Sequence, residues 1–128
     1  MASELRVNTL KDAAGNNSVG MSYVAEGSAK AWVTFDGTAS GATVRDSFNV
    51  ASTDDDGTGL YGVNFSSAMS TANYSSVCNR ASFAGTTAGG ANACTVTAGS
   101  ITKLQAYDSN GILGDRDNIT AHVLGDLA

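Results

Sequence analysis

Acidic residues are the part of this chain whose type and spacing come closest to a chemical site. Three consecutive aspartates, Asp54, Asp55 and Asp56, precede a GTG segment. Loop carboxylates are the ligands that Ca²⁺ prefers, but an EF-hand loop needs acids or amides at alternate positions and a glutamate at the twelfth. The twelfth position here is Phe65. The segment therefore fits a solvated hairpin turn, with an adventitious cation site as the alternative.

The other candidates for catalysis stand apart in the sequence. Asp115 and Asp117 flank Arg116 in the segment GDRDN, which favours a surface turn. His122 is the only histidine, and no serine or cysteine context marks a nucleophile beside it. Glycoside cleavage needs two carboxyl groups facing each other across a cleft, whereas the acids here fall mostly in turns and near the termini. We expect a non-enzymatic protein without a metal or cofactor.

The two cysteines, Cys78 and Cys94, leave two interpretations open. In a secreted protein the pair would indicate a disulfide, whereas thiols are the default in a bacterial cytosol. Neither a CxxC motif nor clustered histidines accompany them, so they do not indicate a metal site.

Composition excludes several classes of partner. The formal net charge is −5 and no run of lysine or arginine exists, so we expect no nucleic-acid binding. No apolar run approaches the ~20 residues of a membrane span, and the N-terminus lacks a signal-peptide core. We therefore expect no membrane insertion and synthesis in the cytoplasm. The apolar 42% is inflated by alanine, and so small a set of large apolar residues favours burial between subunits.

Period-two alternation is the main structural signal. Ala31, Val33 and Phe35 share one face of a predicted strand, while Trp32 and Thr34 share the other. A tryptophan opposite the core-facing set predicts a second apolar contact, either with a loop folded over it or with a neighbouring subunit. Trp32 is therefore our candidate subunit contact.

Short strands separated by turn signals predict an all-β fold, an antiparallel β-sandwich with jelly-roll or Greek-key connectivity. Residues 29–128 form this domain, and residues 1–28 are expected to be an extended arm or connector, or alternatively an edge strand and loop of the same domain. The only short helical possibility is SSAMST around Met69, which we expect to be a loop. Further strands are expected at 43–45, from Phe48 and Val50 onward, and at 60–65, 73–77, 95–107 and 119–123, with loops at 84–93 and 108–118.

Two segments carry a family resemblance: AWVTFDGT, and SFNVASTDDDGTGLYGVNFSSAM after it. Together they resemble a β-domain of tail-fibre and other surface-appendage proteins of tailed bacteriophages, especially marine ones. The resemblance covers about residues 29–74 and more loosely the closing ITAHVLGD, whereas the cysteine-bearing middle departs from it. The N-terminal LRVNTLKDAAG resembles segments that lead such chains toward an attachment or trimerisation region.

The resemblance implies a structural protein of the virion, a homotrimer that contacts other capsid or tail proteins. A capsid decoration (cement) protein, a head fibre and a short tail appendage all remain open. The alternative is a tail-fibre receptor-binding or carbohydrate-binding β-module that recognises a host surface glycan or protein. Its contacts would come from surface loops, for which the candidates are Asp54, Asp55, Asp56, Asn110, Asp115 and Asp117.

Overall fold

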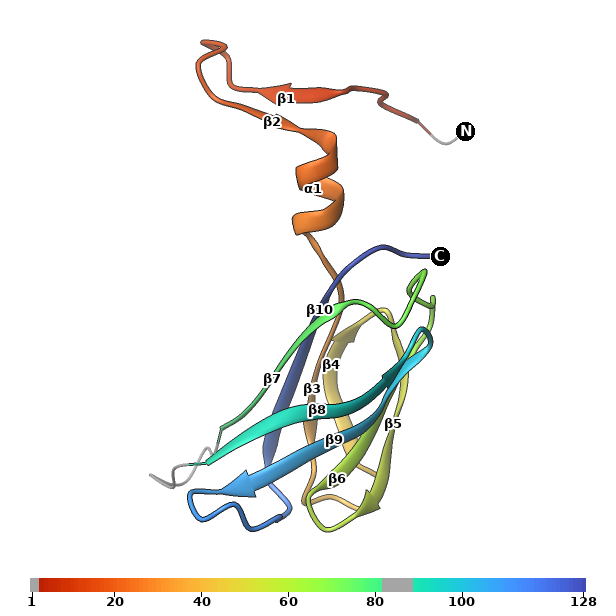
Figure 1. The fold of residues 1–128 in the computed structure, drawn as a ribbon, viewed down its shortest axis with the longest axis vertical. Coiled ribbons are helices and arrows are strands. Elements are labelled where there is room, and N and C mark those ends of the chain that lie inside the picture. Colours follow the sequence, from red (N-terminus) through yellow and green to blue (C-terminus); the bar gives the residue numbers. More distant parts are fainter. Residues whose placement is uncertain (1–2, 82–88) are drawn as a thin grey trace.

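The computed structural model describes residues 3–81 and 89–128. Within these two ranges the chain forms ten strands and one short helix (Figure 1). In chain order these are β1 (Thr9–Lys11), β2 (Ser18–Gly20), α1 (Met21–Gly27), β3 (Ala29–Asp36), β4 (Thr43–Phe48), β5 (Val50–Gly57), β6 (Leu60–Phe65), β7 (Ser75–Ala81), β8 (Gly89–Thr97), β9 (Ser100–Asp108) and β10 (Asn118–Leu124).

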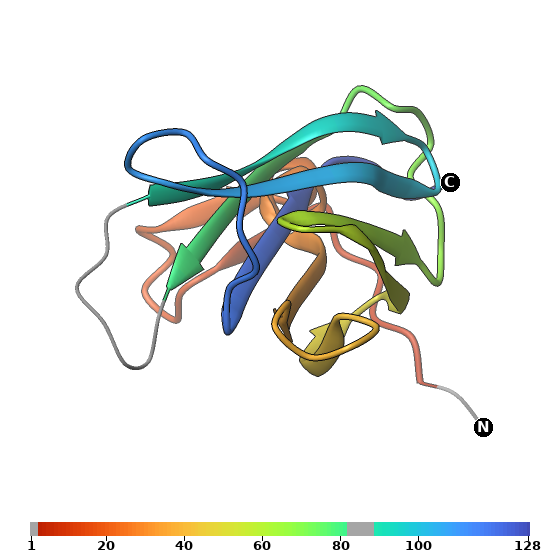
Figure 2. The ribbon, with the colours of Figure 1, turned by 90° about the horizontal axis from the view of Figure 1, so that it is seen from below.

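Eight of these strands form two packed four-stranded antiparallel sheets, which confirms the predicted all-β sandwich. Sheet I has the order β4-β3-β10-β7 and sheet II the order β5-β6-β9-β8. Seen along the long axis, the strands of the two sheets cross (Figure 2). Hairpins join β3 to β4, β5 to β6 and β8 to β9. The first and last strands of the sandwich, β3 and β10, pair at the centre of sheet I.

The core forms where the alternating faces of the two sheets meet. In β3, Ala31, Val33 and Phe35 are buried, as the alternation predicts, and Trp32 lies on the outer face. The Phe35 ring packs edge-to-face on Tyr61 of sheet II, with ring centroids 5.2 Å apart. Such aromatic pairs contribute beyond the area that they bury. The core is therefore set by period-two patterning on facing strands.

The chain passes from sheet I to sheet II at Asn49. This residue has φ of 55°, in the left-handed region that asparagine tolerates better than most residues. Its amide donates to the carbonyl oxygens of Lys30 (2.9 Å) and Ser67 (3.0 Å), and its Oδ1 accepts from the Ser67 amide (2.7 Å). Phe48 therefore ends β4, and the prediction that it begins the next strand was wrong, because the corner at Asn49 intervenes.

Three other local predictions were wrong. The strand expected at 95–107 is divided between β8 and β9 by a hairpin turn at Ala98 and Gly99. The three aspartates lie within β5, and the hairpin turn falls at Thr58 and Gly59, because strand pairing continues to Gly57 opposite Leu60. Strand β8 already begins at Gly89, although 84–93 was expected to be a loop; residues 84–88 lie outside the described ranges. The segment around Met69 is not helical, as expected, and Met69 is buried and bridges to Leu127.

Residues 3–28, hereafter the arm, project from one end of the sandwich (Figure 1). They are not simply extended: β1 and β2 pair as a hairpin, and α1 follows directly. The chain enters sheet I at Ala29. The C-terminal residues return to this end, where the amide of Ser70 donates to the Asp126 carbonyl oxygen (2.8 Å).

We predict that Asn49→Gly lowers the free energy of unfolding by about 1.5–3 kcal/mol, because three side-chain hydrogen bonds are lost. Asn49→Ala should cost about 1 kcal/mol more, since alanine also pays the left-handed backbone penalty. Urea unfolding of the three proteins measures both effects. If Asn49→Ala matched the wild type, the corner would not hold the two sheets together.

Candidate protein-contact surface

Trp32 belongs to a row of side chains that crosses the outer face of sheet I. Strand register places Phe48 of β4 opposite Trp32 of β3, His122 of β10 beside Trp32, and Val77 of β7 beside His122. Phe48 is 54% exposed and Val77 60%, while Trp32 is half-buried. We call these four residues the sheet I row. The alternation that predicted Trp32 on the outer face also places the other three there.

The outer face of sheet II is different in chemistry. Asn64 of β6 donates its side-chain amide to Asp54 Oδ2 (2.7 Å) and Ser52 Oγ (3.0 Å) of β5. On β8 and β9, the Cys94 thiol donates to Gln105 Oε1 (3.1 Å). These polar groups bond to one another, and Asp54 and Cys94 are exposed. An apolar partner therefore fits the sheet I row better than it fits sheet II.

The three aspartates lie on an edge strand, because β5 is the outermost strand of sheet II. Asp54 sits over Gly62, where a side chain would collide with its carboxylate. Asp55 Oδ1 accepts from the Gly57 amide (3.2 Å), and all three residues are exposed. Charges on an edge strand disfavour pairing with another chain. The acidic run therefore protects this edge, which the turn interpretation did not foresee.

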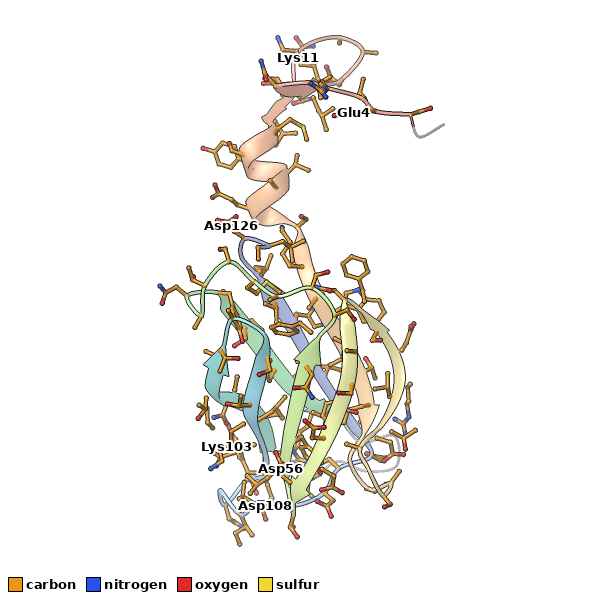
Figure 3. The ribbon with its side chains drawn as sticks, turned by 90° about the vertical axis from the view of Figure 1, so that its right-hand side faces the viewer. Glu4, Lys11, Asp56, Lys103, Asp108 and Asp126 are labelled. Atoms are coloured by element: carbon orange, nitrogen blue, oxygen red, sulfur yellow. The ribbon has the colours of Figure 1, made fainter. Side chains whose placement is uncertain are left out.

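At the end opposite the arm, the 108–118 loop holds the remaining predicted contact residues. Asp108, labelled in Figure 3, caps this loop by accepting from the amides of Asn110 (2.8 Å) and Ile112 (2.9 Å). These hydrogen bonds lower the pKa of the Asp108 carboxyl. The loop tip is therefore ordered, with Asn110 and Ile112 exposed.

Asp115 and Asp117 lie in the same loop, close to its return into β10. Asp115 Oδ1 accepts from the Gly59 amide (2.8 Å) and lies 3.1 Å from the Tyr61 hydroxyl. That hydroxyl also donates to the Gly37 carbonyl oxygen (3.1 Å), and burial with the nearby Asp115 charge raises the Tyr61 pKa. Asp115 thus anchors the 108–118 loop to sheet II, and the Tyr61 hydroxyl links sheet II to the residue after β3. Asp117 is half-buried.

A polar cleft of about 330 Å³ lies where α1 meets the sandwich. Glu26 of α1 and Asp126 line it, together with Tyr74 and several hydroxyl and amide side chains. Asp126 appears at this junction in Figure 3. No sequence signal could have found the cleft, because its lining comes from three segments far apart in the chain: Glu26, residues 70–75 and residues 124–126. Among the described residues, no group of three or more histidine, cysteine or acidic side chains could hold a metal ion.

Both cysteines are free thiols. Cys78 packs against the core, and its burial raises the pKa of the thiol to about 11. Cys94 is exposed on the outer face of sheet II. The two side chains therefore face different environments, and the interpretation as a disulfide does not hold.

No protein-family model, curated protein or solved structure matches this chain. Among residues 3–81 and 89–128, no helix has the length and apolar character needed to cross a bilayer.

We predict that alkali destabilises the protein partly through Cys78. Its folded-state pKa is raised from 9.0 to about 11, so its contribution to stability is complete below pH 9 and is lost as the pH rises toward 11. The free energy of unfolding of Cys78→Ala should fall less steeply than that of the wild type across this window. Equal slopes for the wild type and Cys78→Ala would contradict the prediction.

Proposed function

We propose that this chain is a non-enzymatic structural protein of a bacteriophage particle, a small trimeric surface component that acts by protein–protein contact. A capsid decoration protein or a head fibre is the version that we favour, with a short tail appendage next. The observation that carries the proposal is a sandwich with one polar outer face, one face with an exposed apolar row, and a projecting arm.

The resemblance of residues 29–74 to the β-domain of phage appendage proteins supports the virion setting. These residues make β3 to β6 and the loop after them, which include half of each sheet. The segment therefore contributes Trp32 and Phe48 of the sheet I row as well as the acidic edge strand. The segment thus supplies two of the four residues of the sheet I row, while Val77, His122 and the arm lie outside it.

The arm supports a role in assembly. Large apolar side chains along it are exposed, among them Leu5 (80%) and Tyr23 (76%). Exposed apolar side chains that gather on one part of a molecule mark contact sites for other proteins. A particle component that holds its position by contact needs such surfaces.

We predict that the protein is present in purified virions at a copy number of one per major capsid protein, or a simple fraction such as one third. Quantitative mass spectrometry against the major capsid protein measures this ratio. A few copies per particle would place the protein on the tail instead. Absence from virions would contradict the structural role.

A second function, recognition of a host surface, is favoured by the end opposite the arm. There the ordered 108–118 loop presents Ile112, which is 63% exposed beside Asn110. Ordered loops that carry exposed groups on a rigid scaffold are common binding sites. This function predicts that purified protein competes with virions for host cells and that Ile112→Asp weakens the competition, while Asn92→Asp at an exposed position of β8 does not.

A further inference from the structure

The arm is too small to be stable on its own contacts. Its strands are three residues long and its helix has seven residues, none of them buried. Isolated two-stranded hairpins and helices of this length are marginal in water. The apolar side chains that the arm leaves exposed are Leu5, Val7, Leu10, Val19 and Tyr23. The arm therefore requires a covering surface.

The junction with β3 holds the arm away from its own sandwich. Lys30 Nζ donates to the carbonyl oxygens of Ala25 and Ser28 and to Ser28 Oγ, while the Ser28 amide donates to the Val24 carbonyl oxygen (3.2 Å). These bonds tie the last turn of α1 to the start of β3, so that the arm stands clear of both sheets (Figure 3). Folding back over its own sheet I would break them. The covering surface must therefore come from another molecule.

The sheet I row is the matching unpartnered surface. Phe48 is the last residue of β4 and Val77 lies near the start of β7, which places the row in the half of sheet I nearer the arm. In the arm, the cross-strand pair Leu10 and Val19 lines a shallow hollow of about 290 Å³ between β1 and β2. A projecting aromatic ring such as Phe48 suits this hollow in size and polarity. Lys11 and Asp12 both line its rim, and Lys11 offers the charge opposite to that of Asp46, two residues before Phe48.

We propose that the arm of one copy packs on the sheet I row of a neighbouring copy, with Phe48 seated in the hollow between β1 and β2. We assign the partner of the arm to a second copy of the chain because each copy carries one arm and one sheet I row. Every arm can then pack on one row, and no apolar surface of either kind is left uncovered. Such a head-to-tail contact is heterologous, and the proposed trimer requires that its rotation close into a ring after three copies. Each copy makes the contact twice, once through its arm and once through its row. This proposal rests on the structural role proposed above only for the number of copies, three, in the assembly.

The test uses the full-length chain and two variants that each remove one half of the contact. Leu10→Lys places a charge in the hollow but keeps the row, and Phe48→Lys removes the ring but keeps the arm. Asn64→Lys, on the polar outer face of sheet II, is the matched control. Sedimentation gives the mass of each protein, and circular dichroism with thermal unfolding verifies that each is folded.

Arm exchange predicts that the wild type and Asn64→Lys sediment as trimers, while Leu10→Lys and Phe48→Lys sediment as monomers. Mixing these two variants should give a 1:1 heterodimer, because the intact arm of one meets the intact row of the other. Trp32, the only tryptophan of the chain, should then shift its emission to shorter wavelength. Folded variants that stay monomeric when mixed, or that keep the wild-type mass singly, would overturn the proposal, as would a monomeric wild type.

These outcomes are separate from those of the virion measurement. A heterodimer from the mixture together with absence from virions would leave arm exchange standing and overturn the role in the particle. If the protein is present in virions but the mixed variants stay monomeric, the role in the particle would stand and arm exchange would be overturned. A wild type that is monomeric but is bound by capsid shells would assign the arm to the capsid instead and overturn the second copy as its partner.

Discussion

The pairing of β3 with β10 is the contact on which the rest of the structure depends. It places Ala121 opposite Val33 and Ile119 opposite Phe35, so that the buried faces of both strands meet sheet II together. The same register places His122 beside Trp32 on the outside. Because side chains alternate, a slip by one residue would exchange the core for the outer row. The hydrophobic core and the candidate contact surface are thus fixed by a single register.

The outer faces of the two sheets differ in polarity: that of sheet II is polar, and that of sheet I carries the exposed apolar row. Sheet II presents amides, hydroxyls and carboxylates that bond to one another, and its edge strand β5 carries three aspartates. Sheet I presents aromatic and aliphatic side chains at one end, next to the arm. A net charge of −5 disfavours non-specific association between copies. The association proposed here, through sheet I and the arm, would remove less polar surface from water than association through sheet II.

The sequence predicts most of the sandwich because period-two alternation survives wherever one face of a strand is buried. Ala31, Val33 and Phe35 follow this rule, and so do Tyr61 and Val63. It fails where backbone geometry decides instead. Asn49 adopts a left-handed backbone conformation and turns the chain between β4 and β5. The three aspartates resemble a turn in the sequence, but they are part of β5 because this strand pairs with β6.

The arm was harder still to predict. The α1 sequence MSYVAEG is short, includes β-branched and aromatic residues, and ends without a basic side chain of its own. Its last carbonyl oxygens are instead capped from the next strand by Lys30. Of the candidate contact surface, the sequence indicates Trp32 by alternation. Phe48, His122 and Val77 come from three other strands, and only the strand order brings them into one row.

Hydrogen exchange of the arm amides, measured across a range of protein concentrations, most directly tests whether the exposed arm is a contact surface for another copy. We expect residues 3–28 to exchange freely in dilute solution and to become protected as copies associate. The amides of β3 and β10 should be protected at every concentration. Arm amides that exchange freely at every concentration, or that are already protected in the monomer, would contradict this expectation.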